Sequence, residues 1–366
     1  MKILIYSPSN LRASDQQAQA ELLISQGHQV FLLTWLPIGI LHEKFLSLGA
    51  RATSSSHVKG RSLFFFLNQA RYLVKYCKTN KIDIVFSHLQ SNAVVAGIAK
   101  PFVKARFFYF RHNADYFSLV KSKKSRVLNK LANLLSPVII AISDNVKSEL
   151  IREGVPEKRI KRINLCYNFS DYGAERMHNS SIIRNEISAD LLLISVARLD
   201  KFKRHIMAFE VVRQLVTNGL DCKLICIGEG PYRPELERWL KKHNMQNEIV
   251  LKGHVSNVFD FLDAADLMLL LSCSEASNNA VKEAGICCTP VIVCREVGDF
   301  EAYIIHNENS YLVNKINPIN EAVEILQELQ KNKKILPIVG DKLNLAVASN
   351  FNIENVKIQY NKILGL

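Results

Sequence analysis

This 366-residue sequence has few long apolar runs and no Cys-x-x-Cys pair, and its first half has few acidic residues. Its longest internal apolar stretch, 131–142, is interrupted by Asn133, Ser136 and Pro137 and falls short of the about 20 residues of a spanning helix. The apolar run that opens the chain is too short for a signal-peptide core. These features predict a cytoplasmic protein with no membrane span.

The eight cysteines contain no Cys-x-x-Cys pair, which argues against a zinc knuckle. Cys222 and Cys226 lie on an expected strand, and the adjacent Cys287 and Cys288 cannot easily bridge to each other. We therefore expect small buried thiols in a reducing compartment.

Charge is distributed unevenly along the chain, whose net charge is +13. Residues 1–170 hold 25 Lys and Arg against 9 Asp and Glu, whereas the remainder holds 22 against 25. A basic half joined to a near-neutral half indicates a domain that faces anionic material, such as a lipid surface, a lipid pyrophosphate or nucleic acid. Solvated helix faces are the alternative explanation.

The length favours two domains, and the apolar and charged fractions, 48% and 22%, are those of a globular protein. Short apolar runs alternate with longer amphipathic ones, the pattern of a parallel sheet covered by helices. In the first half, strands are expected at 2–6, 29–34, 82–86, 106–110 and 138–142. Helices are expected at 14–26, 64–79, 91–100, 121–135 and 144–152.

This rhythm breaks at 170–188, which is polar and turn-prone and predicts a linker. A second series of strands is expected near 191–197, 222–227, 248–251, 266–271, 290–294 and 310–313, with a helix at 233–243. The predicted domains are 1–170, 171–349 and a final helix at 350–366. Open parallel sheets bind ligands beyond the carboxyl ends of their strands, so the residues that follow these strands are the candidates for a site.

Arg198 directly follows the expected strand at 191–197, and Lys203 comes five residues later. A planar guanidinium, an ammonium and the free N–H groups of a helix start are suited to a diphosphate. A solvated basic turn that includes Lys201 and Arg204 is the alternative.

Two further turns follow strands of the second half. Gly228-Glu229-Gly230-Pro231 allows a tight turn and close approach of the backbone to a ligand, although many such turns merely reverse the chain. Gly253-His254-Val255-Ser256 is a similar turn.

The loop that follows the expected strand at 266–271 carries the strongest signal. Glu275 stands at its tip, and Glu283 lies about one turn into a helix that we expect to begin near Asn278 or Asn279. Carboxylates in these places suit the hydroxyls of a sugar or ribose, and Ser277 is a further N-cap type. A loop cap and a solvated helix residue are the alternative roles for the two glutamates.

Six short motifs, in this order and spacing, resemble the retaining glycosyltransferases of family 4. They are Val196-Ala197-Arg198-Leu199 with Lys203, Gly228-Glu229-Gly230-Pro231, Gly253-His254-Val255, Ala265-Asp266, Ser274-Glu275 ahead of Glu283-Ala284, and Pro290-Val291-Ile292. The resemblance implies an α/β chain of the GT-B fold, with two facing Rossmann-like domains, parallel sheets and a cleft between them. It also implies that 350–366 is a helix that crosses back to the first domain.

The resemblance assigns roles to the candidates. Arg198 and Lys203 would neutralise the departing diphosphate, Glu283 would bind the ribose, and Glu275 would hold a hydroxyl of the donor sugar. Gly228, Gly230, Val255, Ser277, Asn278 and Asn279 would complete the donor site. His112, after the expected strand at 106–110, would reach the donor sugar, with an ordinary loop histidine as the alternative.

The sequence departs from the family pattern at three places. Residues 7–12 lack the usual glycine pair, Ala276 replaces a glycine, and Lys282 replaces an apolar residue. The first departure weakens any claim that this loop contacts donor or acceptor, and the other two bear on the choice of donor.

We therefore expect an enzyme that moves a sugar from a nucleoside diphosphate sugar, with a UDP-sugar as the expected class, to a hydroxyl of a glycan or lipid-linked acceptor in bacterial surface polysaccharide synthesis. No cofactor is expected, and no metal, since no Asp-x-Asp stands at a strand end. Basic helix 121–135 suggests peripheral contact with an anionic membrane at its cytoplasmic face, or else a helix packed on the sheet. The alternatives are a sugar-nucleotide-binding scaffold without turnover, a nucleic-acid-binding protein, and an epimerase or phosphorylase of the same architecture.

Overall fold

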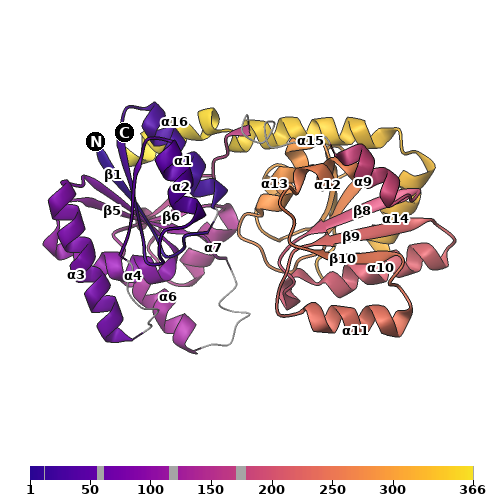
Figure 1. The fold of residues 1–366 in the computed structure, drawn as a ribbon, viewed down its shortest axis with the longest axis horizontal. Coiled ribbons are helices and arrows are strands. Elements are labelled where there is room, and N and C mark those ends of the chain that lie inside the picture. Colours follow the sequence, from indigo (N-terminus) through magenta and orange to yellow (C-terminus); the bar gives the residue numbers. More distant parts are fainter. Residues whose placement is uncertain (12, 56–61, 115–122, 170–178, 366) are drawn as a thin grey trace. The chain divides into compact units, whose positions relative to one another are not determined.

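The computed structural model describes residues 1–11, 13–55, 62–114, 123–169 and 179–365. The chain divides into two units: unit 1 comprises Met1–Tyr167 with Phe351–Leu366, and unit 2 comprises Asn168–Asn350. Each is an α/β unit built on its own parallel sheet (Figure 1). Since 170–178 lie outside the described residues, the linker prediction is tested only in part, and α9 (Ser180–Glu186) occupies much of the rest of it.

Unit 1 contains a seven-stranded sheet in the order β3-β2-β1-β4-β5-β6-β7, with every neighbouring pair parallel. The central strands are almost wholly apolar because helices cover both faces of the sheet. The strands are β1 (Lys2–Ser7), β2 (Gln29–Thr34), β3 (Arg51–Ser54), β4 (Ile84–His88), β5 (Arg106–Arg111), β6 (Val138–Ala141) and β7 (Ile160–Arg162).

Two apolar cores flank this sheet. One joins it to α1 (Ser14–Ser25), α2 (Ile40–Ser47) and α16 (Ile353–Leu364), and the other joins it to α3 (Leu63–Asn80) and α4 (Leu89–Ala99). α16 belongs to unit 1 because Val356, Tyr360 and Leu364 are buried in the first core. The remaining elements are the 3₁₀ turn η1 (Lys100–Phe102), α6 (Lys123–Leu135), α7 (Asp144–Arg152) and the 3₁₀ turn η2 (Glu157–Arg159).

Unit 2 contains a six-stranded parallel sheet in the order β10-β9-β8-β11-β12-β13. Its strands are β8 (Leu191–Val196), β9 (Cys222–Ile227), β10 (Ile249–Gly253), β11 (Leu267–Leu270), β12 (Val291–Cys294) and β13 (Tyr311–Val313). Its helices are α9, α10 (His205–Thr217), α11 (Arg233–His243), α12 (Phe259–Ala264), α13 (Asn279–Ile286), α14 (Pro318–Lys331) and α15 (Ile335–Phe351), with 3₁₀ turns η3 (Lys201–Lys203) and η4 (Phe300–Ala302).

The long periodic elements agree with the sequence prediction to within about two residues. Two edge strands, β3 and β7, and the helices α2, α9, α12, α14 and α15 were not predicted. An edge strand of three or four residues carries too little apolar alternation to be recognised, and it forms because its neighbour supplies the hydrogen bonds. Among the described helices, none combines the length and apolarity needed to cross a bilayer.

Candidate functional site

A cavity of about 590 Å³ lies in unit 2, where the loops that follow β8, β9 and β10 meet the start of α13. It therefore sits at the carboxyl edge of the sheet, as expected for an open parallel sheet. Its lining includes Arg198, Lys203, Gly228, Val255, Asn278, Asn279 and Glu283, which the sequence had singled out. Gly230, Ser277, Glu275 and His112 are not part of that lining.

Gly228 and Gly230 have a structural reason to be glycines. A Cβ on Gly228 would lie 2.1 Å from the carbonyl oxygen of Ala197, and one on Gly230 would lie 2.2 Å from that of Leu199. Gly228 also has a φ of +132°, which side chains rarely adopt. The close approach that these glycines permit is thus between the two loops, whose contact shapes one wall of the cavity.

Arg198 and Lys203 both line the cavity but differ in their partners. Arg198 is exposed, and its guanidinium makes no hydrogen bond or ion pair with any residue that the structure describes. Lys203 donates to Glu275 over 2.6 Å, and the Glu275 side chain is buried. Lys203 ends the 3₁₀ turn η3, two residues before α10 begins at His205. The Arg198 side chain is therefore available to a ligand, whereas the Lys203 ammonium is held by an ion pair with Glu275.

The start of α13 lies against the cavity, with Asn278, Asn279 and Ala280 in its lining. Asn278 is its N-cap, and its side-chain oxygen accepts a hydrogen bond from the N–H of Val281. Asn279 begins the helix and Glu283 lies one turn further on, as predicted. Because the first N–H groups of a helix have no partner within it, this end of α13 presents a partly positive surface to the cavity.

Behind this loop lies a buried ion pair that the sequence did not reveal. The Lys282 ammonium is fully buried and donates to Asp299 Oδ2 over 2.7 Å and to Ser277 Oγ over 2.7 Å. Ser277 in turn donates to the same carboxylate over 2.6 Å. The hydroxyl of Ser277 is thus engaged inside unit 2, which leaves its backbone rather than its side chain for a ligand.

The departure from the family pattern at Lys282 therefore has a structural partner. An apolar residue there would need none, whereas a buried ammonium requires a countercharge, which Asp299 provides from the loop after β12. The ammonium also lies over the ring of Tyr303 at 5.3 Å from its centre. Burial, with Asp299 and Glu275 nearby, raises the pKa of Tyr303 well above its ordinary value, so this phenol stays neutral.

His112 lies in unit 1, one residue beyond β5, in a chain of hydrogen bonds. His112 Nε2 and His88 Nδ1 are 2.8 Å apart, and His88 Nε2 lies 3.0 Å from Gln19 Oε1. Gln19 donates to the hydroxyl of Tyr360 on α16 over 2.8 Å. This network, with Asp15 at 3.7 Å from His112 Nδ1, fixes the ring of His112 far more firmly than an ordinary loop histidine.

Both imidazoles of this network are neutral near pH 7. Burial lowers the pKa of His88 well below its ordinary value, and the neighbouring His112 lowers it further. Burial also lowers the pKa of His112, although the carboxylate of Asp15 opposes the shift. His112 is therefore held as a neutral hydrogen-bonding group.

Among the described residues, Asp15, His88 and His112 form a cluster that could hold a metal ion, because one possible ligand atom of each lies within 4.8 Å of the others. The separation of 2.8 Å between the two ring nitrogens is that of a hydrogen bond. Two nitrogens bound tetrahedrally to zinc would lie roughly 3.3 Å apart. We therefore assign the cluster as hydrogen-bonded, and the prediction that the enzyme uses no metal stays a prediction.

The sequence also missed His254 and Val258, which line the cavity. His254 lies in the turn Gly253-His254-Val255-Ser256 that follows β10, next to the predicted site residue Val255. Its position at the end of a strand could have identified it. Val258 had no such signal, because a valine in a loop is not distinctive.

The chain matches two family descriptions, one for each half. Residues 180–342 match the family described as glycosyl transferases group 1, and residues 17–169 match glycosyltransferase family 4. Neither range overlaps the other, and together they span most of both units.

Curated relatives and solved structures agree with this assignment. The chain is 24% identical to N-acetylgalactosamine-N,N'-diacetylbacillosaminyl-diphospho-undecaprenol 4-alpha-N-acetylgalactosaminyltransferase of Campylobacter jejuni, over 71% of this chain and 70% of that protein. It is 25% identical to alpha-monoglucosyldiacylglycerol synthase of Acholeplasma laidlawii, over 86% of each. The structure of HepE from Anabaena in complex with UDP and glucose superposes with a TM-score of 0.84 at 16% identity, over 100% of this chain and 99% of that one.

These matches confirm the predicted fold and enzyme class. The described strands and helices have the arrangement of two Rossmann-like units, each with a parallel sheet. The chain belongs to the group 1 glycosyltransferases and has the GT-B fold.

Proposed function

We propose that this enzyme transfers a sugar, with retention at the anomeric carbon, from a UDP-sugar to a hydroxyl of a glycan or lipid-linked acceptor in the synthesis of a bacterial surface polysaccharide. The observation that carries the proposal is the cavity of unit 2, in which Arg198, Lys203 and Glu283 converge. Its relatives include an enzyme named for a diphospho-undecaprenol acceptor, and its structural neighbours include one solved with UDP and glucose.

Cleavage of the bond between the anomeric carbon and the diphosphate leaves negative charge on the departing group. The guanidinium of Arg198 can bind two phosphate oxygens at once. Lys203 adds a second positive charge, and its hydrogen bond to Glu275 fixes the position of the ammonium. The N–H groups at the start of α13 supply a third source of positive potential. Because these groups are in place before the reaction, they stabilise the leaving charge at little cost in reorganisation.

The family resemblance gives the remaining candidate side chains roles toward the ribose and the sugar of the donor. Glu283 offers a carboxylate to the ribose hydroxyls. Glu275, which accepts a hydrogen bond from Lys203, offers its carboxylate to a hydroxyl of the donor sugar when the donor binds. His112 of unit 1 offers a neutral ring, held by His88, to a donor-sugar hydroxyl. No cofactor enters this scheme.

A thermal-shift screen with UDP, GDP, ADP and their common sugar conjugates tests the proposal. We expect UDP and one UDP-sugar to stabilise the wild type by about 2.7 kcal/mol at 100 times the dissociation constant. Glu283→Ala should lose this stabilisation. Glu324→Ala, which removes an exposed glutamate of α14 in the same unit, should keep it.

If no nucleotide stabilised a well-folded sample, the proposed donor site would be wrong. If another nucleotide replaced UDP with the same dependence on Glu283, the site would stand and the donor class would change. The anomeric configuration of the product, followed by proton NMR from the start of the reaction, decides retention separately.

A further inference from the structure

Helix α6 of unit 1 buries the side that would be expected to face solvent. Its buried side chains are Asn129, Ala132 and Asn133, and both asparagines donate hydrogen bonds to Glu153 beyond α7. Its larger apolar side chains point outward instead: Val127 is 57% exposed and Leu134 is 72% exposed. A helix of a globular protein normally does the reverse.

Helix α3, in the same unit, also exposes large apolar side chains. Phe64 is 69% exposed, and Leu63 beside it is exposed as well. α3 and α4 pack on the same face of the sheet, and Gly97 of α4 packs directly against Leu135 of α6. α4 contacts both α3 and α6, and the three helices are neighbours in Figure 1. The apolar side chains that α3 and α6 expose therefore belong to one group of helices.

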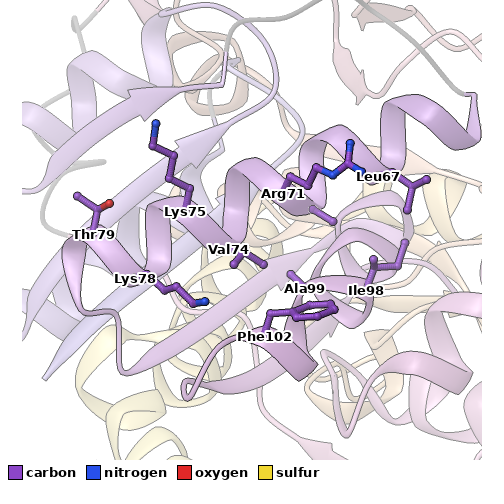
Figure 2. A pocket seen from close by; sticks show the side chains of 10 residues that line it. Leu67, Arg71, Val74, Lys75, Lys78, Thr79, Ile98, Ala99 and Phe102 are labelled. Carbon is purple, nitrogen blue, oxygen red and sulfur yellow. The ribbon is translucent and has the colours of Figure 1, made fainter.

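A groove of about 660 Å³ runs between α3, the end of α4 and η1. Its floor is apolar, with Val74 on one side and Ile98 and the ring of Phe102 on the other, as Figure 2 shows. Phe102 is 62% exposed, so this ring forms an open lip of the groove. Such a surface is costly to leave in water.

The rim of this groove is basic. Arg71, Lys75 and Lys78 line it, and all are exposed. None of their charged groups makes a hydrogen bond or ion pair with a residue that the structure describes. Lys78 reaches toward the ring of Phe102 in Figure 2. Neither α3 nor α6 contains an aspartate or glutamate, and α6 adds four cations of its own.

We propose that the face formed by α3, η1 and α6 docks unit 1 on an anionic membrane, with the acyl chain of a phospholipid in the groove and its phosphate at Arg71, Lys75 and Lys78. Aliphatic walls with a cationic rim complement an acyl chain that ends in a phosphate. Nucleic acid fits less well, because the groove offers few polar groups to read or hold bases.

The groove is an anchor and not the place of sugar transfer. η1 precedes the amino end of β5, whereas His112 follows its carboxyl end, so the two lie at opposite edges of the sheet. Docking extends the proposed function, since a lipid-linked acceptor resides in such a membrane, but it does not depend on which donor is used.

Co-sedimentation of the full chain with vesicles tests this proposal. We expect binding at low salt to vesicles of phosphatidylcholine mixed with phosphatidylglycerol, and little binding to phosphatidylcholine alone. Lys75→Gln/Lys78→Gln should weaken binding roughly 30-fold, from about 1 kcal/mol for each cation near an anionic surface. Lys241→Gln/Lys242→Gln on α11 of unit 2, which changes the net charge equally, should weaken it only a few-fold.

The apolar part of the face has its own pair of variants. Phe102→Ser should weaken binding roughly tenfold or more because a large side chain no longer enters the lipid. Ile358→Ser, at an exposed position of α16, should leave it unchanged. The melting temperature and the stabilisation by UDP should be unchanged in every variant, so a failed docking surface is distinguishable from a failed donor site.

Absence of wild-type binding to anionic vesicles at low salt would overturn the proposal. So would equal losses in the α3 and α11 double variants, since general charge attraction would then account for binding. Equal binding to both kinds of vesicle that did not respond to Lys75→Gln/Lys78→Gln would overturn the assigned role of the cations.

Discussion

Units 1 and 2 share an architecture but hold their proposed catalytic side chains by different means. In unit 1, His112 is fixed by hydrogen bonds to another neutral ring, His88, at the carboxyl end of the sheet. In unit 2, the corresponding edge is fixed by ion pairs, between Lys203 and Glu275 and between Lys282 and Asp299. The same fold can thus present a neutral hydrogen-bonding surface or a permanently charged one.

This difference matches what each side would have to do in glycosyl transfer. A leaving diphosphate needs fixed positive charge, which a neutral histidine could not provide near pH 7. A sugar hydroxyl needs a hydrogen-bonding partner of defined direction, for which a charge is unnecessary. The contrast predicts that variants in unit 2 should have the larger energetic consequences.

Lys282→Met is expected to have the largest effect on stability. It leaves the buried carboxylate of Asp299 without its cation, and breaking a buried pair in this way costs about 3–5 kcal/mol. The free energy of unfolding in urea measures the loss. The double variant Lys282→Met/Asp299→Asn removes both charges and should recover most of it.

A loss below about 1 kcal/mol for Lys282→Met would place this pair with exposed salt bridges and remove the contrast between the units. If the double variant were no more stable than the single one, packing rather than charge would explain the effect.

His205 in unit 2 sharpens the comparison because it is a buried imidazole beside fixed charges. Its pKa is lowered to about 4, first by burial and then by Lys203, and neither ring nitrogen has a hydrogen-bond partner among the described residues. The unfolded chain takes up a proton near pH 6.5 while the folded chain does not, so stability falls as the pH drops from 6.5 toward 4. The expected loss between pH 7 and pH 4.5 is about 2 to 3 kcal/mol.

His205→Leu should remove this part of the pH dependence, and urea unfolding at the two pH values measures it. The wild type and the variant are compared at each pH because other groups also titrate. Parallel stability curves for the two proteins would show that His205 is protonated alike in the folded and unfolded chains.

His112→Ala tests unit 1 and should have the smallest effect. The loss of one neutral hydrogen bond, about 0.5–1.5 kcal/mol, should lower kcat/KM by up to roughly tenfold. Stabilisation by UDP should be unchanged, because the cavity that we propose for it is built wholly from unit 2. A drop of a thousandfold would instead indicate a role in stabilising charge.

The long elements could be predicted because their own residues decide them. β9 at Cys222–Ile227 and α11 at Arg233–His243 have the periodicity and boundary residues of a buried strand and an amphipathic helix. The face that α6 presents to solvent was less predictable. The sequence pattern of α6 predicts that its leucines face either the sheet or a membrane. The structure shows that Asn129 and Asn133 lie inside because both donate hydrogen bonds to Glu153.

The sequence by itself determined which loops follow the strands of unit 2. Because parallel strands bring their carboxyl ends to one edge of a sheet, these loops supply most of the cavity. Arg198, directly after a strand, and Glu283, one turn into a helix, both line that cavity. The tertiary structure alone decided the partners: Lys203 with Glu275, Lys282 with Asp299, and His112 with His88. Each pair joins residues that are distant in the sequence, and hydrogen bonds and ion pairs depend on distances of a few ångströms that no local pattern specifies.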